Sequence, residues 1–465
     1  MAQALALVRR DDLIADVDSL SLLSYTDGFQ LAEDGWRQAV PGYGDERVAE
    51  ALTLRVSAAT HDLLAVALQS LDAKVQQIDW HRDEVEPYGV WLRTNLRNEG
   101  GAGGALRQAL VTAARRSALT AFSYSADNQS LIAEYGLALE RTPWWEDTTV
   151  GTKSATAVNC VGGTAGFSAV LGDVPARLAL VSFRGVSGVT GPLTKFWLGF
   201  RTARLGAVAN FQSYWSLRKG ALFGSDTTGG TSNVDTEAKD GYKAVCTFAT
   251  VATLLERVRI RVTDVTATPD DQRGSYAVLL RAKNTAAGTT RVRLKDGLYN
   301  SCNNVHSRVL ISSTSYQYYE LGTVQIPSPG RYVAGVNMMT AYAMAIDAER
   351  VSGTPSLDLA ELILIPVTEG FVASDTGGGG VEYVAADERP LYVQHRPEGR
   401  IDAIYQSGDI PQYLGSPTLV GGLPNHSAGG ILVVAGQRLA SSVLADTVSL
   451  TLKVYQRWAQ LRGAE

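Results

Sequence analysis

The chain has 465 residues, a formal net charge of -5 at pH 7 and a hydrophobic content of 45%. This length predicts two or three domains with ample core, and the weakly acidic balance argues against nucleic acid as a direct partner. No apolar run approaches the roughly 20 residues that a membrane helix needs, so no membrane insertion is expected.

The N-terminal residues do not resemble a signal peptide. Their apolar run is short, no charge precedes it, and Arg9, Arg10, Asp11 and Asp12 follow at once. We therefore expect synthesis in a cytoplasm and, for any outside location, a route other than general secretion.

The three cysteines do not form a disulfide framework. Cys302 and His306 are too few for a metal site, so neither metal nor cofactor is expected.

Residues 1–147 predict a small α+β platform. Thr60 to Asp79 reads as a helix, with Thr60 as its N-cap and Asp62 in its first turn. One apolar stripe follows the helical spacing: Leu64, Leu68, Leu71, Val75 and Ile78. Expected strands follow at 90–97, 106–115, 118–124 and 131–141. A helix packed over an antiparallel sheet or split β-barrel is the economical architecture.

The stretch Leu131–Asp147 marks the end of this platform. Its first half alternates between apolar and polar residues, which is typical of a half-buried strand. The alternation ends beside four residues that we interpret as an interdomain hinge, namely Arg141, Pro143, Trp144 and Trp145. They would fix the angle at which the next domain leaves the platform.

Residues 150–368 predict an all-β domain. Short alternating runs such as Val258–Val262 and Val292–Leu294 are separated by polar turns, with almost no helical periodicity. The last run, Leu357–Val367, places Leu357, Leu359, Ile363 and Ile365 on one expected face and ends at Pro366. Many short strands of this kind indicate a β-sandwich or jelly roll.

Aromatic residues in this domain suggest a glycan site. Trp215, Tyr214 and Trp197 are the candidates, because flat exposed rings stack on the C–H faces of sugars. The alternative is that these rings fill the core.

Basic residues of the same domain alternate with apolar ones on several strands. They are Arg257, Arg259, Arg261, Arg281, Arg291, Arg293 and Lys295. They could form a positive surface for an acidic partner, or an ordinary solvated strand face that discourages aggregation.

A glycine-rich stretch, Asp375–Gly380, reads as a linker, and residues 381–465 predict a third, C-terminal β domain. Its last strand alternates from Val448 to Val454 and ends in Tyr455, Gln456, Arg457 and Trp458. This ending resembles the aromatic and basic residues that close the platform.

Enzyme motifs are not found in the sequence. It contains no G-x-S-x-G, H-E-x-x-H or P-loop pattern, and the five histidines are scattered. Scattered carboxylates leave a two-carboxylate glycosidase open, although nothing points to one. We expect a protein without catalytic residues.

The order of these parts resembles the distal tail proteins, and related tail structural proteins, of long-tailed bacteriophages. Arg141, Pro143, Trp144 and Trp145 match the Arg-Pro-aromatic segment that ends such strands in that family, and Tyr455–Trp458 resembles tail-protein termini. The resemblance covers the platform best, the middle domain by architecture only, and the C-terminal domain hardly at all.

The resemblance implies a structural protein of the virion tail, assembled in the host cytoplasm. It implies a homo-oligomeric ring, commonly a hexamer, in a tail tip or baseplate that joins the tail tube to adhesion components. Its partners would be its own copies, the tail tube and tail-tip proteins. The alternative is a carbohydrate-binding virion adhesin that recognises a host surface glycan through the central β-sandwich.

Overall fold

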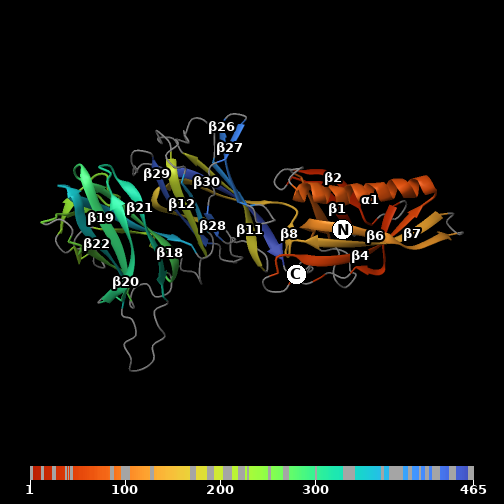
Figure 1. The fold of residues 1–465 in the computed structure, drawn as a ribbon, viewed down its shortest axis with the longest axis horizontal. Helices are drawn as coiled ribbons and strands as arrows, with labels where there is room; N and C mark the ends of the chain where they lie inside the picture. The colour runs from red at the N-terminus through yellow and green to blue at the C-terminus, as the bar shows by residue number, and fades with distance from the viewer. Residues whose placement is uncertain are drawn as a thin grey trace, which may run out of the picture.

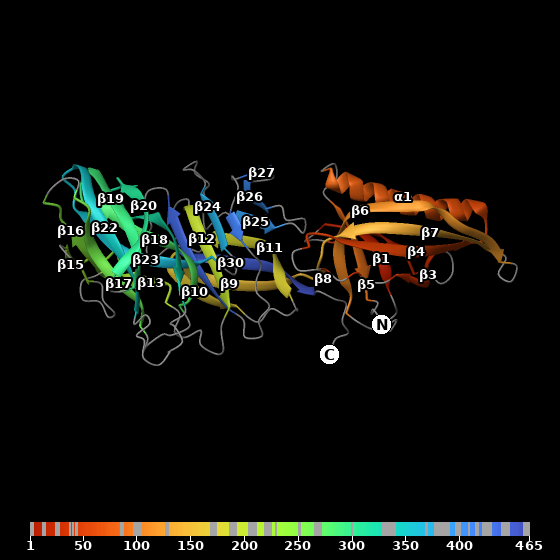
Figure 2. The ribbon, with the colours of Figure 1, turned by 60° about the horizontal axis from the view of Figure 1, so that its bottom comes forward.

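The computed structural model describes residues 4–11, 15–23, 28–36, 39, 41, 45–83, 88–95, 105–125, 130–167, 174–185, 193–202, 212–217, 226–227, 230–249, 253–264, 272–298, 301–327, 341–367, 371–375, 391–395, 401–407, 410–413, 418–420, 430–438 and 447–458. Within these ranges the protein is mainly β, with one helix, several antiparallel sheets and no sheet closed into a barrel. Figures 1 and 2 show an elongated molecule with three units in a row.

The N-terminal unit comprises the described residues up to 147. Its strands are β1 (Leu5–Arg10), β2 (Asp16–Ser21), β3 (Gly28–Trp36), β4 (Val48–Ala58), β5 (Gly89–Thr94), β6 (Arg107–Ser125), β7 (Ser130–Arg141) and the short β8 (Trp145–Asp147). They pair in the order β2-β1-β5-β6, and β6 continues into β7-β4-β3. The two expected strands at 106–115 and 118–124 are one long strand, because register shifts let β6 follow β7 along its length.

The helix α1 (His61–Arg82) confirms the predicted helix and extends it by one turn. The Thr60 hydroxyl caps it by accepting a hydrogen bond from the Leu63 N–H at 3.2 Å. Leu64, Leu71 and Ile78 are buried, and the other two residues of the predicted stripe pack partly buried against the same core. The stripe therefore packs the helix onto the sheet as expected from its spacing.

The proximal β-unit follows the N-terminal unit and is built from two separate parts of the chain. Its strands are β9 (Gly151–Asn159), β10 (Val161–Phe167), β11 (Val174–Gly185), β12 (Leu193–Thr202), β24 (Phe371–Asp375), β25 (Leu391–His395), β26 (Ile401–Ser407), β27 (Ile410–Tyr413), β28 (Thr418–Val420), β29 (Gly430–Arg438) and β30 (Thr447–Trp458). One sheet runs β9-β30-β11-β25-β26-β27, and the other runs β10-β29-β12-β24-β28. Both sheets contribute to one core.

The distal β-unit comprises the described residues from 212 to 367. Its strands are β13 (Tyr214–Ser216), β14 (Asp226–Thr227), β15 (Gly230–Val234), β16 (Tyr242–Cys246), β17 (Leu255–Asp264), β18 (Gly274–Asn284), β19 (Gly288–Leu298), β20 (Ser301–Ile311), β21 (Gln317–Ile326), β22 (Ala341–Gly353) and β23 (Leu357–Pro366). The sheets β15-β16-β23-β18-β21 and β14-β17-β22-β19-β20 share a second core.

The predicted boundaries 150–368 and 381–465 do not match these units. Strand β30 pairs with β9 and β11, and β29 pairs with β10 and β12, so the predicted C-terminal domain completes the proximal β-unit. The distal β-unit is inserted between β12 and β24 (Figure 1). These pairings join segments more than two hundred residues apart, and no local sequence pattern reports them.

Strand β23 also differs from the prediction. A register shift opposite Arg281 and Ala282 leaves Ala360 out of the ladder, as a β-bulge does. Leu357 and Leu359 face the distal core as predicted, but Ile363 and Ile365 lie on the opposite face. There they pack against the proximal β-unit through Val433 and Ala435. The bulge thus lets one strand serve two interfaces.

The two parts of the proximal β-unit are expected to unfold together. Leu178 on β11 and Leu452 on β30 are buried in one core. Truncation of either to Ala should lower the free energy of unfolding by about 2–5 kcal/mol. Both variants should shift the same transition in thermal denaturation, whereas Lys453→Ala should change it little. A transition that moves in Leu452→Ala but not in Leu178→Ala would indicate an independent C-terminal domain.

Candidate functional site

The first candidate site is the joint between the N-terminal unit and the proximal β-unit. The short strand β8 lies between β6 and β30, so the sheet runs from one unit into the next (Figure 1). Glu146 pairs with Arg457, and Trp145 pairs with Trp458. The aromatic and charged residues that close the platform and those that end β30, which resemble each other in sequence, therefore lie on hydrogen-bonded neighbouring strands.

A buried carboxylate lies at the centre of this joint. Glu146 on β8 accepts hydrogen bonds from Arg177 on β11 at 2.8 Å and from Arg457 on β30 at 2.9 Å. Burial disfavours the ionised carboxylate, but the charges and hydrogen bonds of the two arginines outweigh it and hold the pKa of Glu146 below its ordinary value. One side chain thus ties three strands from distant parts of the chain.

A second buried ion pair lies on the N-terminal side of the joint. The Arg141 guanidinium donates to Glu50 at 2.6 and 2.8 Å, and both side chains are fully buried. The Trp36 indole N–H donates to the same carboxylate at 2.9 Å. Arg141 also lies 4.3 Å from the centre of the Trp145 ring and donates to the carbonyls of Thr142 and Pro143. Ion pair and cation–π contact together fix the corner between β7 and β8.

The four predicted hinge residues all lie at this corner. Arg141 and Trp145 are buried, whereas Pro143 and Trp144 are half-buried. Sequence reasoning missed Glu50, Glu146 and Arg177. Glu146 follows the tryptophan pair directly in the sequence. Its two partners, Arg177 and Arg457, lie 31 and 311 residues further along the chain, so no local pattern links them to it.

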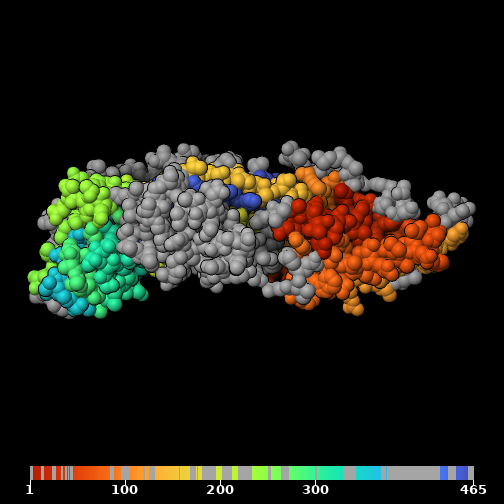
Figure 3. Space-filling model, turned by 90° about the horizontal axis from the view of Figure 1, so that it is seen from above, coloured from red at the N-terminus to blue at the C-terminus, as the bar shows by residue number. Residues whose placement is uncertain are grey.

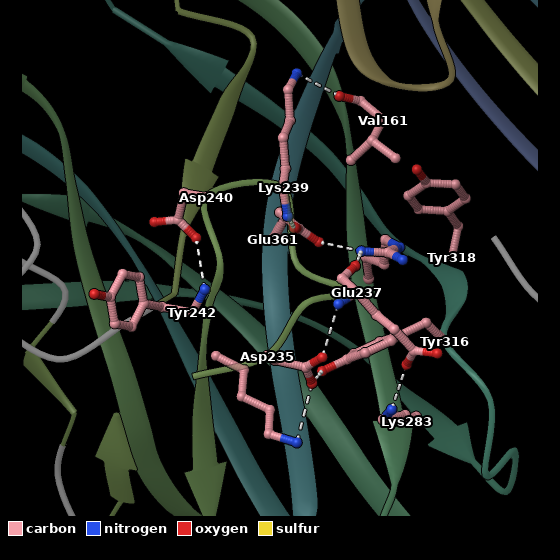
Figure 4. Close-up of polar contacts among 12 residues, drawn as sticks. Val161, Asp235, Glu237, Lys239, Asp240, Tyr242, Lys283, Tyr316, Tyr318 and Glu361 are labelled. Carbon is pink, nitrogen blue, oxygen red and sulfur yellow. Dashed lines mark hydrogen bonds and ion pairs between the residues drawn. The ribbon is translucent and has the colours of Figure 1, made fainter. Parts of the chain in front are cut away.

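The second candidate site is the joint between the two β-units, drawn in Figure 4. The Lys239 ammonium donates to the carbonyl of Val161 at 2.7 Å, and the Tyr318 hydroxyl donates to the carbonyl of Cys160 at 3.0 Å. Lys239 also lies 3.9 Å from the centre of the Tyr214 ring. Burial lowers the pKa of Lys239, and the nearby charge of Glu361 partly offsets this effect.

Acidic groups beneath Lys239 are paired as well. Glu361 accepts from Arg281 at 2.9 Å, and both side chains are fully buried. Asp235 accepts from the Tyr316 hydroxyl at 2.8 Å and lies 3.0 Å from the Lys243 ammonium (Figure 4). Burial opposes the charge of Lys243, but hydrogen bonds to Asp358 and Asp235 outweigh it and raise the pKa of this lysine.

The predicted glycan-stacking residues lie at or near this second joint. Trp197 and Trp215 are each only 6% exposed, so their ring faces are not available to a sugar. Trp197 packs edge-on against Tyr318, and Trp215 belongs to the distal core. Tyr214 is half-buried, and Lys239 covers its ring. Core filling explains these aromatic side chains better than sugar stacking.

The predicted basic surface is largely neutralised. Strand β22 places Asp347 and Glu349 beside β19, where they pair with Arg293 at 2.6 Å and with Arg291 at 2.9 Å. Further pairs join Arg259 and Lys295 to Glu256, and Arg281 points inward to Glu361. This face is therefore a mixed ladder of charges rather than a positive field.

The described part of the chain contains no group of three or more His, Cys, Asp or Glu side chains that could bind a metal ion. Its helix is not apolar enough to be a candidate membrane span. Both joints pair buried charges with one another, an arrangement suited to holding units together.

Comparisons with known proteins give no assignment. No protein-family model matches the chain, and no curated protein matches it.

The shared carboxylate of the first joint is expected to be a major contributor to stability. Glu146→Gln leaves two arginine side chains without their buried counter-charge, which should lower the free energy of unfolding by about 3–5 kcal/mol. The exposed pair of Glu140 with Arg47 provides a matched control, and Glu140→Gln should cost less than about 1 kcal/mol. Equal losses in the two variants, measured by denaturant unfolding, would contradict this role.

The ionisation of Glu146 sets the direction in which the free energy of unfolding changes with pH. Because the folded-state pKa of Glu146 lies below its ordinary value of 4.5, its contribution is present above that pH and is lost as the pH falls through the folded-state pKa. Unfolding of the Glu146→Gln variant should therefore depend less steeply on pH in the acid range than unfolding of the parent protein.

Proposed function

We propose that this protein is a structural, ring-forming subunit of a phage tail tip or baseplate that joins the tail tube to adhesion components. The order of the units supports this proposal, because a helix-bearing antiparallel platform is followed by β-units that project from it. In this proposal the platform is the split β-barrel of a tail-tube-like domain, and the projecting part has a jelly-roll or sandwich architecture. The protein would reside in the virion tail.

The first joint is the observation that carries the proposal. A ring subunit that presents adhesion components at a fixed angle requires a connection that does not bend. Here the sheet continues from β6 through β8 to β30, and Glu146 locks it to β11. Buried charge pairs tolerate little change of geometry, because each lost contact leaves an unpaired charge. A flexible binding module would need no such joint.

Ring formation needs surfaces that bind the next copy. Among the described strands, β2 pairs with β1 alone and β3 pairs with β4 alone, so the N-terminal unit ends in an edge strand on each side. Head-to-tail contacts between unlike surfaces generate closed rings when the rotation closes. Two different edges on one platform suit this type of contact.

The alternative function, a carbohydrate-binding adhesin acting through the central β-domain, has less support. It relied on exposed rings at Trp215, Tyr214 and Trp197, and two of these rings are buried. A glycan site elsewhere on the distal β-unit would need other residues.

The proposal is tested by the oligomeric state of the purified chain. Negative-stain images and sedimentation velocity over a concentration series should show discrete rings of several copies, whose fraction rises with concentration. A protein that remains monomeric up to its solubility limit, alone and mixed with isolated tail tubes, would overturn the proposal. Binding on a glycan array without ring formation would favour the adhesin.

A further inference from the structure

A lysine and two carboxylates meet on one sheet of the distal β-unit. Lys243 on β16 and Asp358 on β23 are diagonal neighbours across the ladder that joins these strands. The Lys243 ammonium lies 2.6 Å from an Asp358 oxygen and 3.0 Å from an Asp235 oxygen. The side chains of Asp358 and Asp235 are only 1% and 9% exposed. One amine is thus in contact with two carboxyl groups that are almost excluded from water.

The turn between β15 and β16 covers this face of the sheet. The carbonyl of Glu237 accepts a hydrogen bond from Arg281 at 2.7 Å, and Ala238 is buried against Tyr316. The same turn supplies Asp235, which accepts hydrogen bonds from the Glu237 N–H at 2.9 Å and from the Tyr316 hydroxyl at 2.8 Å (Figure 4). These contacts hold Asp235 in a fixed position beside the lysine.

Asp358 differs from another buried carboxylate of the same unit. One Asp358 oxygen has no hydrogen-bond partner among the described residues, and burial raises the pKa of this carboxyl above its ordinary value. Asp347 lies 2.9 Å from Lys295 but also 2.6 Å from Arg293, whose guanidinium does not lose its proton. The arginine keeps Asp347 ionised, whereas Asp358 can accept a proton from the lysine beside it.

We propose that Lys243 and Asp358 condense into an intramolecular amide, an isopeptide bond. A nitrogen at 2.6 Å from a carboxyl oxygen is roughly 3–3.5 Å from the carboxyl carbon, which is the separation of a near-attack geometry. The two side chains provide both reacting groups, so the reaction needs no co-reactant. The bond does not depend on the ring-forming function.

Asp235 supplies the proton transfers of this reaction. Movement of one ammonium proton to Asp358 gives a neutral amine beside a neutral carboxylic acid. The Lys243 nitrogen then attacks Cγ of Asp358, and Asp235 accepts a proton from that nitrogen. Asp235 returns the proton to the leaving hydroxyl, the C–O bond breaks and one water molecule departs. Burial opposes the charge of Asp235, but its hydrogen bonds outweigh this effect and lower its pKa, so it is ionised and able to act as the base.

The bond would close a covalent loop around most of the distal β-unit. Residues 244–357 lie between the two linked side chains and include β17 to β22. The distal β-unit forms the end of the molecule opposite the N-terminal unit (Figure 3), and it is inserted between β12 and β24. A pulling force along the chain would therefore pass through the bond between Lys243 and Asp358 rather than through the strands inside the loop.

The intact mass of the purified full chain tests this proposal. We expect a mass below that of the sequence by one water molecule, about 18 Da, and a branched peptide that joins positions 243 and 358 in a tandem mass spectrum of the digest. Lys243→Arg keeps the positive charge but lacks a primary amine, so this variant should have the full mass of its sequence. Lys295→Arg alters the matched pair with Asp347 and should keep the deficit.

Each outcome decides for or against the bond. A full mass in the parent protein, or a deficit that persists in Lys243→Arg, would overturn the proposal. If Lys243→Arg does not fold, the presence or absence of the branched peptide in the parent protein decides alone. Asp235→Asn removes the base and should leave most molecules at full mass, whereas an undiminished deficit in this variant would overturn the role of Asp235.

Discussion

The fold depends most on a single buried carboxylate shared by two arginines. Glu146 lies on β8, the last strand of the N-terminal unit, Arg177 comes from β11 of the proximal β-unit, and Arg457 comes from β30, the last described strand of the chain. The chain must therefore be complete to residue 457 before this joint can form. The junction between the first two units therefore depends on the last described strand of the chain.

Joining two units through buried charges costs desolvation free energy, whereas apolar side chains could fill the same space without that cost. The ion pairs add directionality, because a carboxylate that binds two guanidinium groups accepts few other arrangements. The pairs Arg141–Glu50 and Arg281–Glu361 follow the same logic at the platform corner and in the distal β-unit. The fully buried arginines Arg141 and Arg177 therefore give the connection between the N-terminal unit and the proximal β-unit a defined geometry, and Arg281 does the same within the distal β-unit.

The sequence predicted the local elements well and their assembly poorly. The helix predicted at 60–79 and found at 61–82 followed from its N-cap and the spacing of its apolar residues, because a helix packed on a sheet needs one apolar stripe. The insertion of the distal β-unit could not be predicted, because the pairing of β29 with β12 joins strands that carry no mutual local signal. The bulge at Ala360 places Ile363 and Ile365 on the opposite face of β23 from Leu357 and Leu359. An alternating sequence pattern does not show where such a bulge falls, so it assigned all four residues to one face. The aromatic clusters around Trp197 and Trp215 were ambiguous, because the sequence does not distinguish a tryptophan buried in the core from one exposed for sugar stacking.

The most direct test of the account measures whether the first joint is rigid. Spin labels at Ser70 on α1 and at Thr164 on β10, both exposed, can be placed without interference from the buried native cysteines. Pulsed electron–electron double resonance on dilute protein should give one narrow distance distribution between these labels, and Glu146→Gln should broaden it. A broad distribution in the protein with Glu146 intact would show that the units move freely and would contradict the central role of the shared carboxylate.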